Sequence, residues 1–222
     1  MANSKNIVAF AGCEGFDIII YLSRILNKIG RKVLIADHSD TIAIASATPE
    51  ITGLNITEDI VTYRDLDFTA KNLDKETILP YDDILINCGM NRPRIIEFIV
   101  NKVVFITDMY QFNIKRIAQL DYYDGLFAEN TLIIKDVVNT RLTTQSILSL
   151  LNKNITQDKV NIIYWDEGDY SNSLLINHGQ TIGFKGISKS LRGLLLKEVQ
   201  AMKPDITDKK LKMAFKLARK GE

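Results

Sequence analysis

The chain has 222 residues, of which 46% are hydrophobic and 25% charged, and its formal net charge is +1. This length suffices for one α/β domain with its own core, so we expect a single domain over residues 1–222. The near-zero net charge excludes a protein whose whole surface is built for nucleic acid or for an anionic membrane. The start of the chain lacks the apolar segment of a signal peptide and no apolar run reaches ~20 residues, so we expect a cytoplasmic protein.

Apolar runs typical of buried strands alternate along the chain with amphipathic stretches typical of helices. The expected strands are residues 6–10, 32–37, 83–89, 103–107, 132–138 and 161–164. The expected helices are residues 16–29, 113–120, 143–151, 170–177, 188–202 and 207–220. Residues 41–72 show no dominant period, and a helix at 51–54 and a strand at 60–63 are the candidates there. This order predicts an α/β fold with a doubly wound, mostly parallel sheet flanked by helices, which binds ligands at the carboxyl ends of its strands.

A glycine turn joins the first expected strand to the first expected helix, and it consists of Gly12, Cys13, Glu14, Gly15, Phe16 and Asp17. Strand, glycine turn and helix is the arrangement in which backbone N–H groups bind phosphates. A working P-loop also needs a lysine for the β- and γ-phosphates and a hydroxyl for magnesium. Phe16 and Asp17 occupy these two positions here. Two glycines in such a turn are also common for steric reasons alone.

Two further expected strands end in polar residues. Residues 32–37 end in Asp37, and residues 83–89 contain Asn87 just before their final glycine. Because the carboxyl ends of parallel strands meet at one edge of a sheet, these residues and the glycine turn can converge on one crevice.

Two other clusters invite a chemical interpretation. His38 follows Asp37 directly, but His178 is the only other histidine, so a capped turn is favoured over a metal or acid–base site. Cys13 and Cys88 have no C-x-x-C spacing, so we expect two reduced thiols and no metal site.

The order of these features resembles the MinD/ParA group of P-loop ATPases, the deviant Walker family. Gly12 and Gly15 match glycines of the family loop K-G-G-x-G-K-T, and Asp37 matches an aspartate that the family places near the magnesium water shell. Residues 106–110 match the turn after a later strand, and residues 164–179 match an acidic turn, a helix and a glycine. The resemblance implies a P-loop NTPase-like fold, ATP and magnesium as cofactors, and a homodimer that forms across the nucleotide.

The loop departs from the family at its charged positions. The family's signature lysine is Ala11, its loop lysine is Phe16, its magnesium hydroxyl is Asp17, and the aspartate of a later strand is Asn87. Phosphoryl transfer depends on positioning and electrostatic stabilisation, so we expect ATP hydrolysis to be lost and ATP binding to be disfavoured. We assign no catalytic residue and no metal ligand. The residues of this degenerate nucleotide site are Gly12, Cys13, Glu14, Gly15, Phe16, Asp17, Asp37 and Asn87.

These departures favour a pseudo-ATPase that acts as a scaffold or localisation factor for division, partition or pilus/secretion machinery. By resemblance, degenerate relatives of the TadZ/CpaE type localise pilus assembly. The alternative is a weak but genuine ATPase switch that binds and slowly hydrolyses ATP through backbone amides, Asp37 and a lysine from elsewhere, and that dimerises with nucleotide. A third hypothesis is a site for another small molecule with Cys13 or Cys88 as a reactive thiol.

The C-terminal expected helix, residues 207–220, is basic and amphipathic. Such a helix can lie on an anionic membrane, as it does in members of the resembled family, which would place the protein at the inner face of the membrane. The thin apolar face favours a solvated helix or a helix docked at an interface instead. DNA binding is the weakest hypothesis; it would use this tail together with Lys185, Lys189, Arg192 and Lys197.

Overall fold

The computed structural model describes residues 5–48, 55–93, 100–123 and 129–220. Within these ranges eight strands form one sheet in the order β3-β4-β2-β5-β1-β6-β7-β8. The strands are β1 (Asn6–Gly12), β2 (Val33–Asp37), β3 (Val61–Tyr63), β4 (Leu66–Thr69), β5 (Asp83–Gly89), β6 (Lys102–Thr107), β7 (Glu129–Val137) and β8 (Val160–Tyr164). Neighbouring strands are parallel except for the pair β3 and β4, so the predicted doubly wound, mostly parallel α/β fold is confirmed.

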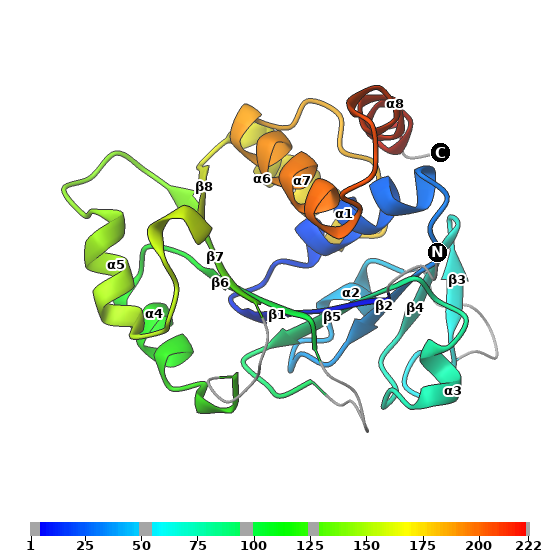
Figure 1. Cartoon of the computed structure of the whole chain (residues 1–222), viewed down its shortest axis with the longest axis horizontal. Coiled ribbons are helices and arrows are strands. Elements are labelled where there is room, and N and C mark those ends of the chain that lie inside the picture. Colours follow the sequence, from blue (N-terminus) through cyan, green and yellow to red (C-terminus); the bar gives the residue numbers. More distant parts are fainter. Residues whose placement is uncertain (1–4, 49–54, 94–99, 124–128, 221–222) are drawn as a thin grey trace.

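Helices cover both faces of this sheet. They are α1 (Phe16–Lys28), α2 (Ala43–Ser46), α3 (Lys75–Ile78), α4 (Gln111–Ala118), α5 (Thr144–Leu151), α6 (Glu167–Asn177), α7 (Lys189–Met202) and α8 (Asp208–Ala218). Helices α1, α7 and α8 lie together over one face, whereas α4 and α5 lie side by side over the other (Figure 1). Successive side chains of a strand point to opposite faces of the sheet, so each strand contributes to the core on both sides. In β1, Val8 and Phe10 belong to the core under the first group of helices, and Ile7 and Ala9 belong to the core under the second.

The differences from the predicted elements are shifted bounds and short elements that were not predicted. Helix α6 begins at Glu167 rather than at residue 170, because the Asp166 carboxylate accepts the Asp169 N–H and caps the helix. Strand β3 confirms the candidate at 60–63, while α2, β4 and α3 were not predicted. The candidate helix at 51–54 lies outside the described residues.

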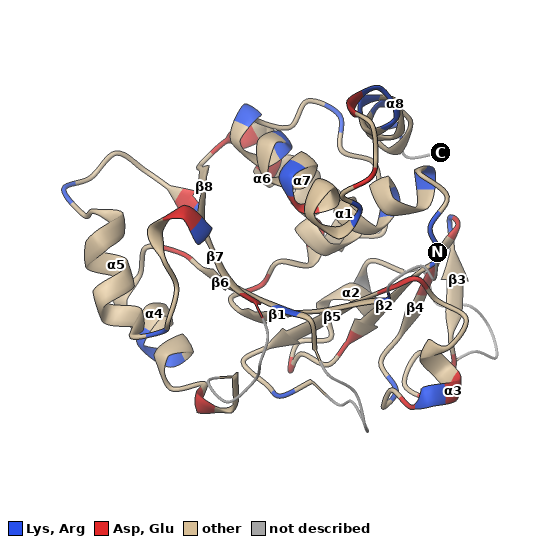
Figure 2. Ribbon diagram, viewed as in Figure 1, with Lys and Arg blue, Asp and Glu red and all other residues tan. Residues whose placement is uncertain are grey.

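The last helix, α8, docks on the protein itself. Leu211, Ala214 and Phe215 are buried against the core, and the buried Arg24 donates from Nε to the Ala218 carbonyl at 3.0 Å. An arginine at this position satisfies an otherwise unpaired carbonyl at the helix end. The lysines of α8 lie on its exposed side, where Figure 2 shows a basic stretch of ribbon. The larger part of the apolar face is thus covered by the protein itself, whereas Met213 and Leu217 stay exposed. Among the described helices, none combines the length and apolarity needed to cross a membrane.

Candidate functional site

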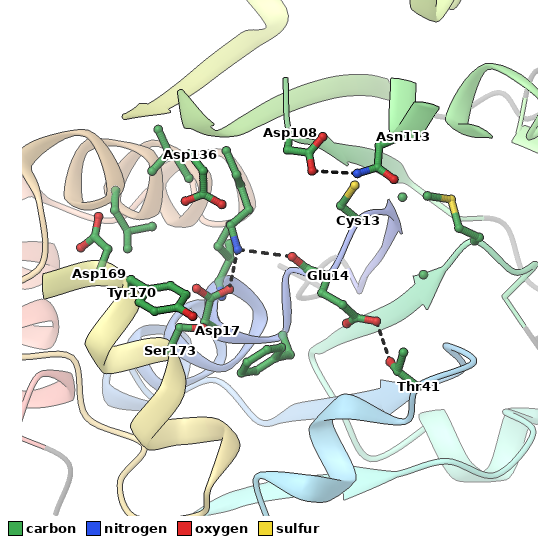
Figure 3. A pocket seen from close by; sticks show the side chains of 18 of the residues that line it. Cys13, Glu14, Asp17, Thr41, Asp108, Asn113, Asp136, Asp169, Tyr170 and Ser173 are labelled. Carbon is green, nitrogen blue, oxygen red and sulfur yellow. Dashed lines mark hydrogen bonds and ion pairs between the residues drawn. The ribbon is translucent and has the colours of Figure 1, made fainter. Parts of the chain in front are cut away.

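A cavity of about 510 Å³ lies at the carboxyl ends of the central strands, beside the N-terminus of α1 (Figure 3). Most of the charged side chains in its lining are acidic, and most of these are labelled in Figure 3: Glu14, Asp17, Asp40, Asp108, Asp136 and Asp169. The described residues contribute two basic side chains to the lining, Arg116 and Lys135. The cavity is therefore electronegative, which favours cations and disfavours anions.

The glycine turn forms one wall of this cavity and packs tightly on β6. Gly12 has φ +119°, and a Cβ at this position would lie 2.2 Å from the Ile106 carbonyl oxygen. The Cys13 N–H donates to that same oxygen at 2.8 Å, and the Ile18 N–H donates to Asp17 Oδ1 at 2.9 Å. Glycine is thus required by the close approach of two strands. Two of the backbone donors around the turn are bonded within the protein.

Lys135 reaches the glycine turn from β7. Its Nζ lies 3.3 Å from the Glu14 carbonyl oxygen and 3.3 Å from Asp17 Oδ1. Burial by itself would lower the pKa of Lys135. The negative charges of Asp17 and Asp136 together outweigh this effect of burial, so the pKa of Lys135 lies above its usual value. Lys135 therefore stays charged and holds the turn against β7. The sequence prediction missed this residue, and its only signal is a lysine inside the apolar run of residues 132–138.

Asp37 and Asn87 lie side by side in paired strands, but their side chains are bonded to each other. Asp37 Oδ1 accepts from Asn87 Nδ2 at 3.1 Å and from the Ser39 hydroxyl at 2.6 Å, and Asp37 Oδ2 accepts from the Ile44 N–H at 2.8 Å. Both residues are buried, and neither lines the cavity. Their bonds stabilise the turn after β2, so the Asp37 carboxylate already has donors on both oxygens.

The other predicted site residues divide into two groups. Gly12, Cys13, Glu14, Phe16 and Asp17 line the cavity, as expected for a site at the glycine turn. Gly15 is buried as the residue that precedes α1 and does not line the cavity. The site assignment itself stays a prediction.

The two cysteines are free thiols in different surroundings. Cys13 lines the cavity, and burial together with Asp108 raises the pKa of its thiol. Cys88 is buried in β5, where burial raises its pKa to about 12. Both shifts disfavour the thiolate, which is the reactive form. In the part of the chain that the structure describes, no group of three or more His, Cys, Asp or Glu side chains is arranged to hold a metal ion.

The lining is chemically mismatched to the cofactor that the fold implies, a nucleoside triphosphate with magnesium. Phe16 offers no charge at the position of the loop lysine, and the Lys135 ammonium is paired with Asp17. Glu14 and Asp17 add carboxylates to the lining at the glycine turn, and like charges at ~4 Å repel by about 1 kcal/mol even in water.

Comparison with known proteins supports the fold but gives no match by sequence. No family model matches the chain, and no curated protein matches it. Three solved structures match it over most of its length. A putative plasmid partition protein from Borrelia burgdorferi B31 bound to AMPPNP is 15% identical, with a TM-score of 0.61 over 90% of this chain and 98% of that one. A MinC:MinD cell division protein complex from Aquifex aeolicus is 13% identical, with a TM-score of 0.60 over 91% and 97%.

A ParA family ATPase from Chlorobium tepidum TLS is 15% identical, with a TM-score of 0.51 over 98% of both chains. The identities are low, so the agreement concerns the overall fold alone. The chain therefore has the P-loop NTPase-like fold of the MinD and ParA ATPases and resembles that family.

Proposed function

We propose that residues 1–222 form one MinD/ParA-like pseudo-ATPase domain, which acts in the cytoplasm as a scaffold or localisation factor for a cellular machine. The observation that carries this proposal is the acidic lining of the cavity at the glycine turn. Six carboxylates face two basic side chains among the described residues, and one of these, Lys135, is already paired with Asp17. A triphosphate would enter this cavity against the repulsion of these carboxylates, without a free lysine at the loop to offset it.

The test of this proposal is calorimetry with ATP and magnesium, together with light scattering of the same sample. We expect no heat of binding and no change of mass when ATP is added. A matched sample of the variant Asp136→Asn should behave in the same way, because one neutralised carboxylate leaves the loop without its lysine. Binding of ATP at micromolar affinity would contradict the loss of nucleotide chemistry.

A weak ATP-binding switch is the second candidate, and the position of Lys135 favours it. Its ammonium lies 3.3 Å from the Glu14 carbonyl oxygen, so a lysine from another strand does reach the turn. In this case ATP would have to displace the Asp17 carboxylate from Lys135. The variant Lys135→Met would then abolish ATP binding, whereas Arg116→Met, which removes the other basic lining residue, would weaken it less.

The proposal includes a homodimer, which the resemblance implies, and a protein partner that belongs to the machine. The exposed aromatic side chains Tyr110, Phe112, Tyr164 and Tyr170 lie next to the cavity lining in the sequence or form part of it. Aromatic residues of this kind are enriched at interfaces. Light scattering of Phe112→Asp against Leu79→Asp, an exposed apolar residue in another part of the chain, tests whether the homodimer uses this face or leaves it free for the partner.

A further inference from the structure

The surface around the cavity combines negative charge with exposed aromatic rings. Five aromatic side chains, each more than half exposed, follow the carboxyl ends of β6 and β8; we call them the aromatic rim: Tyr110, Phe112, Tyr164, Trp165 and Tyr170. Tyr164 and Tyr170 also line the cavity itself. Scattered exposed rings are ordinary, but five in two segments at the carboxyl ends of β6 and β8, with β7 between these strands, make a candidate interaction surface.

The charges inside the rim define the chemistry of the occupant. Tyr170, Asp169 and Asp136 lie on one side of the cavity in Figure 3, and Asp108 lies near Cys13 on another. The carboxylates are spread around the cavity instead of meeting at one point, and the described residues form no metal site. A cavity of about 510 Å³ is of a size for organic groups. An extended basic group therefore fits this lining better than a metal ion does.

Two carboxylate oxygens beside the cavity lack hydrogen-bond donors. Glu14 Oε1 accepts from the Thr41 hydroxyl at 2.6 Å, but Glu14 Oε2 is shielded from solvent and has no donor. Asp169 Oδ1 accepts from the Ser188 N–H at 2.7 Å, whereas Asp169 Oδ2 is shielded and has no donor either. Buried carboxylate oxygens are normally paired, so each of these two side chains keeps one unused acceptor.

We propose that the acidic cavity and the aromatic rim form a docking surface for a basic segment of a partner protein, which inserts an arginine or lysine side chain between the carboxylates. Charge complementarity selects this occupant, because a second copy of the chain would bring the same acidic face. Arginine suits the site well, since its guanidinium donates to several carboxylates and stacks on tyrosine rings such as Tyr170. The inference rests on the proposed function, because a nucleoside triphosphate bound in this cavity would occupy the same space.

The probe is a short acetylated peptide of alternating arginine and glycine, and its control is the same peptide with citrulline in place of arginine. Trp165 is the only tryptophan of the chain and belongs to the rim, so its fluorescence reports binding at this face. We expect the arginine peptide to change the fluorescence at about 50 mM salt and to bind several-fold more weakly at about 300 mM salt. The citrulline peptide should bind at least about tenfold more weakly.

Two double variants with the same change of net charge separate this surface from general electrostatics. Glu14→Gln with Asp136→Asn neutralises two lining carboxylates and keeps an acceptor for the Thr41 hydroxyl, and we expect about a tenfold loss of peptide affinity. Glu58→Gln with Glu76→Gln neutralises two exposed carboxylates that do not line the cavity, and the affinity should stay the same. Circular dichroism of each variant verifies that it is folded.

Several results would overturn the inference. Equal binding of the citrulline peptide, or an equal loss in the two double variants, would show that the cavity does not select the basic group. Spermidine that binds as tightly as the arginine peptide would indicate a site for a free organic cation instead of a protein partner. A dimer that excludes the peptide would indicate that a second copy covers the face. Heat on addition of ATP would instead contradict the proposed function, whatever the peptide does.

Discussion

Lys135 and Asp17 lie 118 residues apart in the sequence and form an ion pair of 3.3 Å between β7 and the first turn of α1. The side chains are 18% and 7% exposed, so the pair is mostly withdrawn from solvent. The pair therefore joins the edge half of the sheet to the helix that follows the glycine turn. It also places the positive charge of Lys135 beside the glycine turn.

Removal of the ammonium should destabilise the fold, because the Asp17 carboxylate is left buried without its partner. We expect Lys135→Met to lower the free energy of unfolding by about 2 kcal/mol or more, as measured by urea denaturation. The variant Asp17→Asn with Lys135→Met should be more stable than Lys135→Met alone. Lys28→Met, which removes the more exposed pair with Asp65, is the control and should change stability by less than about 1 kcal/mol. Equal effects of the two lysine variants would contradict a buried role for Lys135.

Thiol labelling should distinguish the two cysteines. At neutral pH we expect Cys88 to remain unlabelled by iodoacetamide in the folded protein, because burial raises its pKa to about 12 and keeps reagent out. Cys13 is partly exposed and should react, but more slowly than a free thiol, since burial and Asp108 raise its pKa. Mass spectrometry of the digested protein measures both, and both should react in urea. Rapid labelling of native Cys13 would revive the hypothesis of a reactive thiol at the cavity.

The protein should lose stability at alkaline pH through its buried phenols. Burial raises the pKa of Tyr123 and of Tyr21 above the ordinary value of 10.0, and neighbouring Cys88 adds to the shift at Tyr123. Because the folded-state pKa lies above the unfolded one, this contribution to stability is present below about pH 10 and is lost as the pH rises further. Urea midpoints measured from about pH 9 to about pH 11.5 should fall, and Tyr123→Phe should flatten the fall. Midpoints that stay constant over this range would argue against buried neutral phenols.

Two glycine substitutions should have opposite effects. In Gly12→Ala the added Cβ would meet the Ile106 carbonyl oxygen at 2.2 Å with φ at +119°, so we expect a loss of about 3 kcal/mol or a failure to fold. In Gly193→Ala the Cβ enters open space on the exposed side of α7, so we expect a gain of about 0.5–1 kcal/mol. Thermal unfolding of both proteins measures the difference, and a tolerated alanine at position 12 would show that the turn can move away from β6.

The sequence predicted the architecture well where the elements are long and periodic. The β-α-β start, the strand at residues 83–89 and the two C-terminal helices all lie within two residues of the predicted bounds, because apolar periodicity and caps such as Ser188 define them. Helices α2 and α3 and strand β4 have four residues each, which is too short for a period to emerge. Their positions depend on tertiary packing, which a local pattern does not contain.

The candidate site was predictable only in part. Adjacent strand ends can be inferred from a parallel fold, so the approach of Asp37 and Asn87 to the glycine turn was foreseeable. Whether a side chain turns toward the cavity or toward its neighbour depends on contacts such as the bond from Ser39 to Asp37. The contact of Lys135 with the glycine turn depends on the order of β1, β6 and β7 in the sheet. No motif in the sequence predicts this order.

The bond from Arg24 to the Ala218 carbonyl has a consequence for synthesis of the chain. It joins residues 194 positions apart, and α1, which is synthesised well before α7 and α8, packs against both of these helices. Until those helices follow, the side chains of α1 are exposed to any hydrophobic surface in the vicinity. Native folding of the first helix is therefore delayed until translation has passed α8, and chains that stop before it are expected to be substrates for chaperones and proteases.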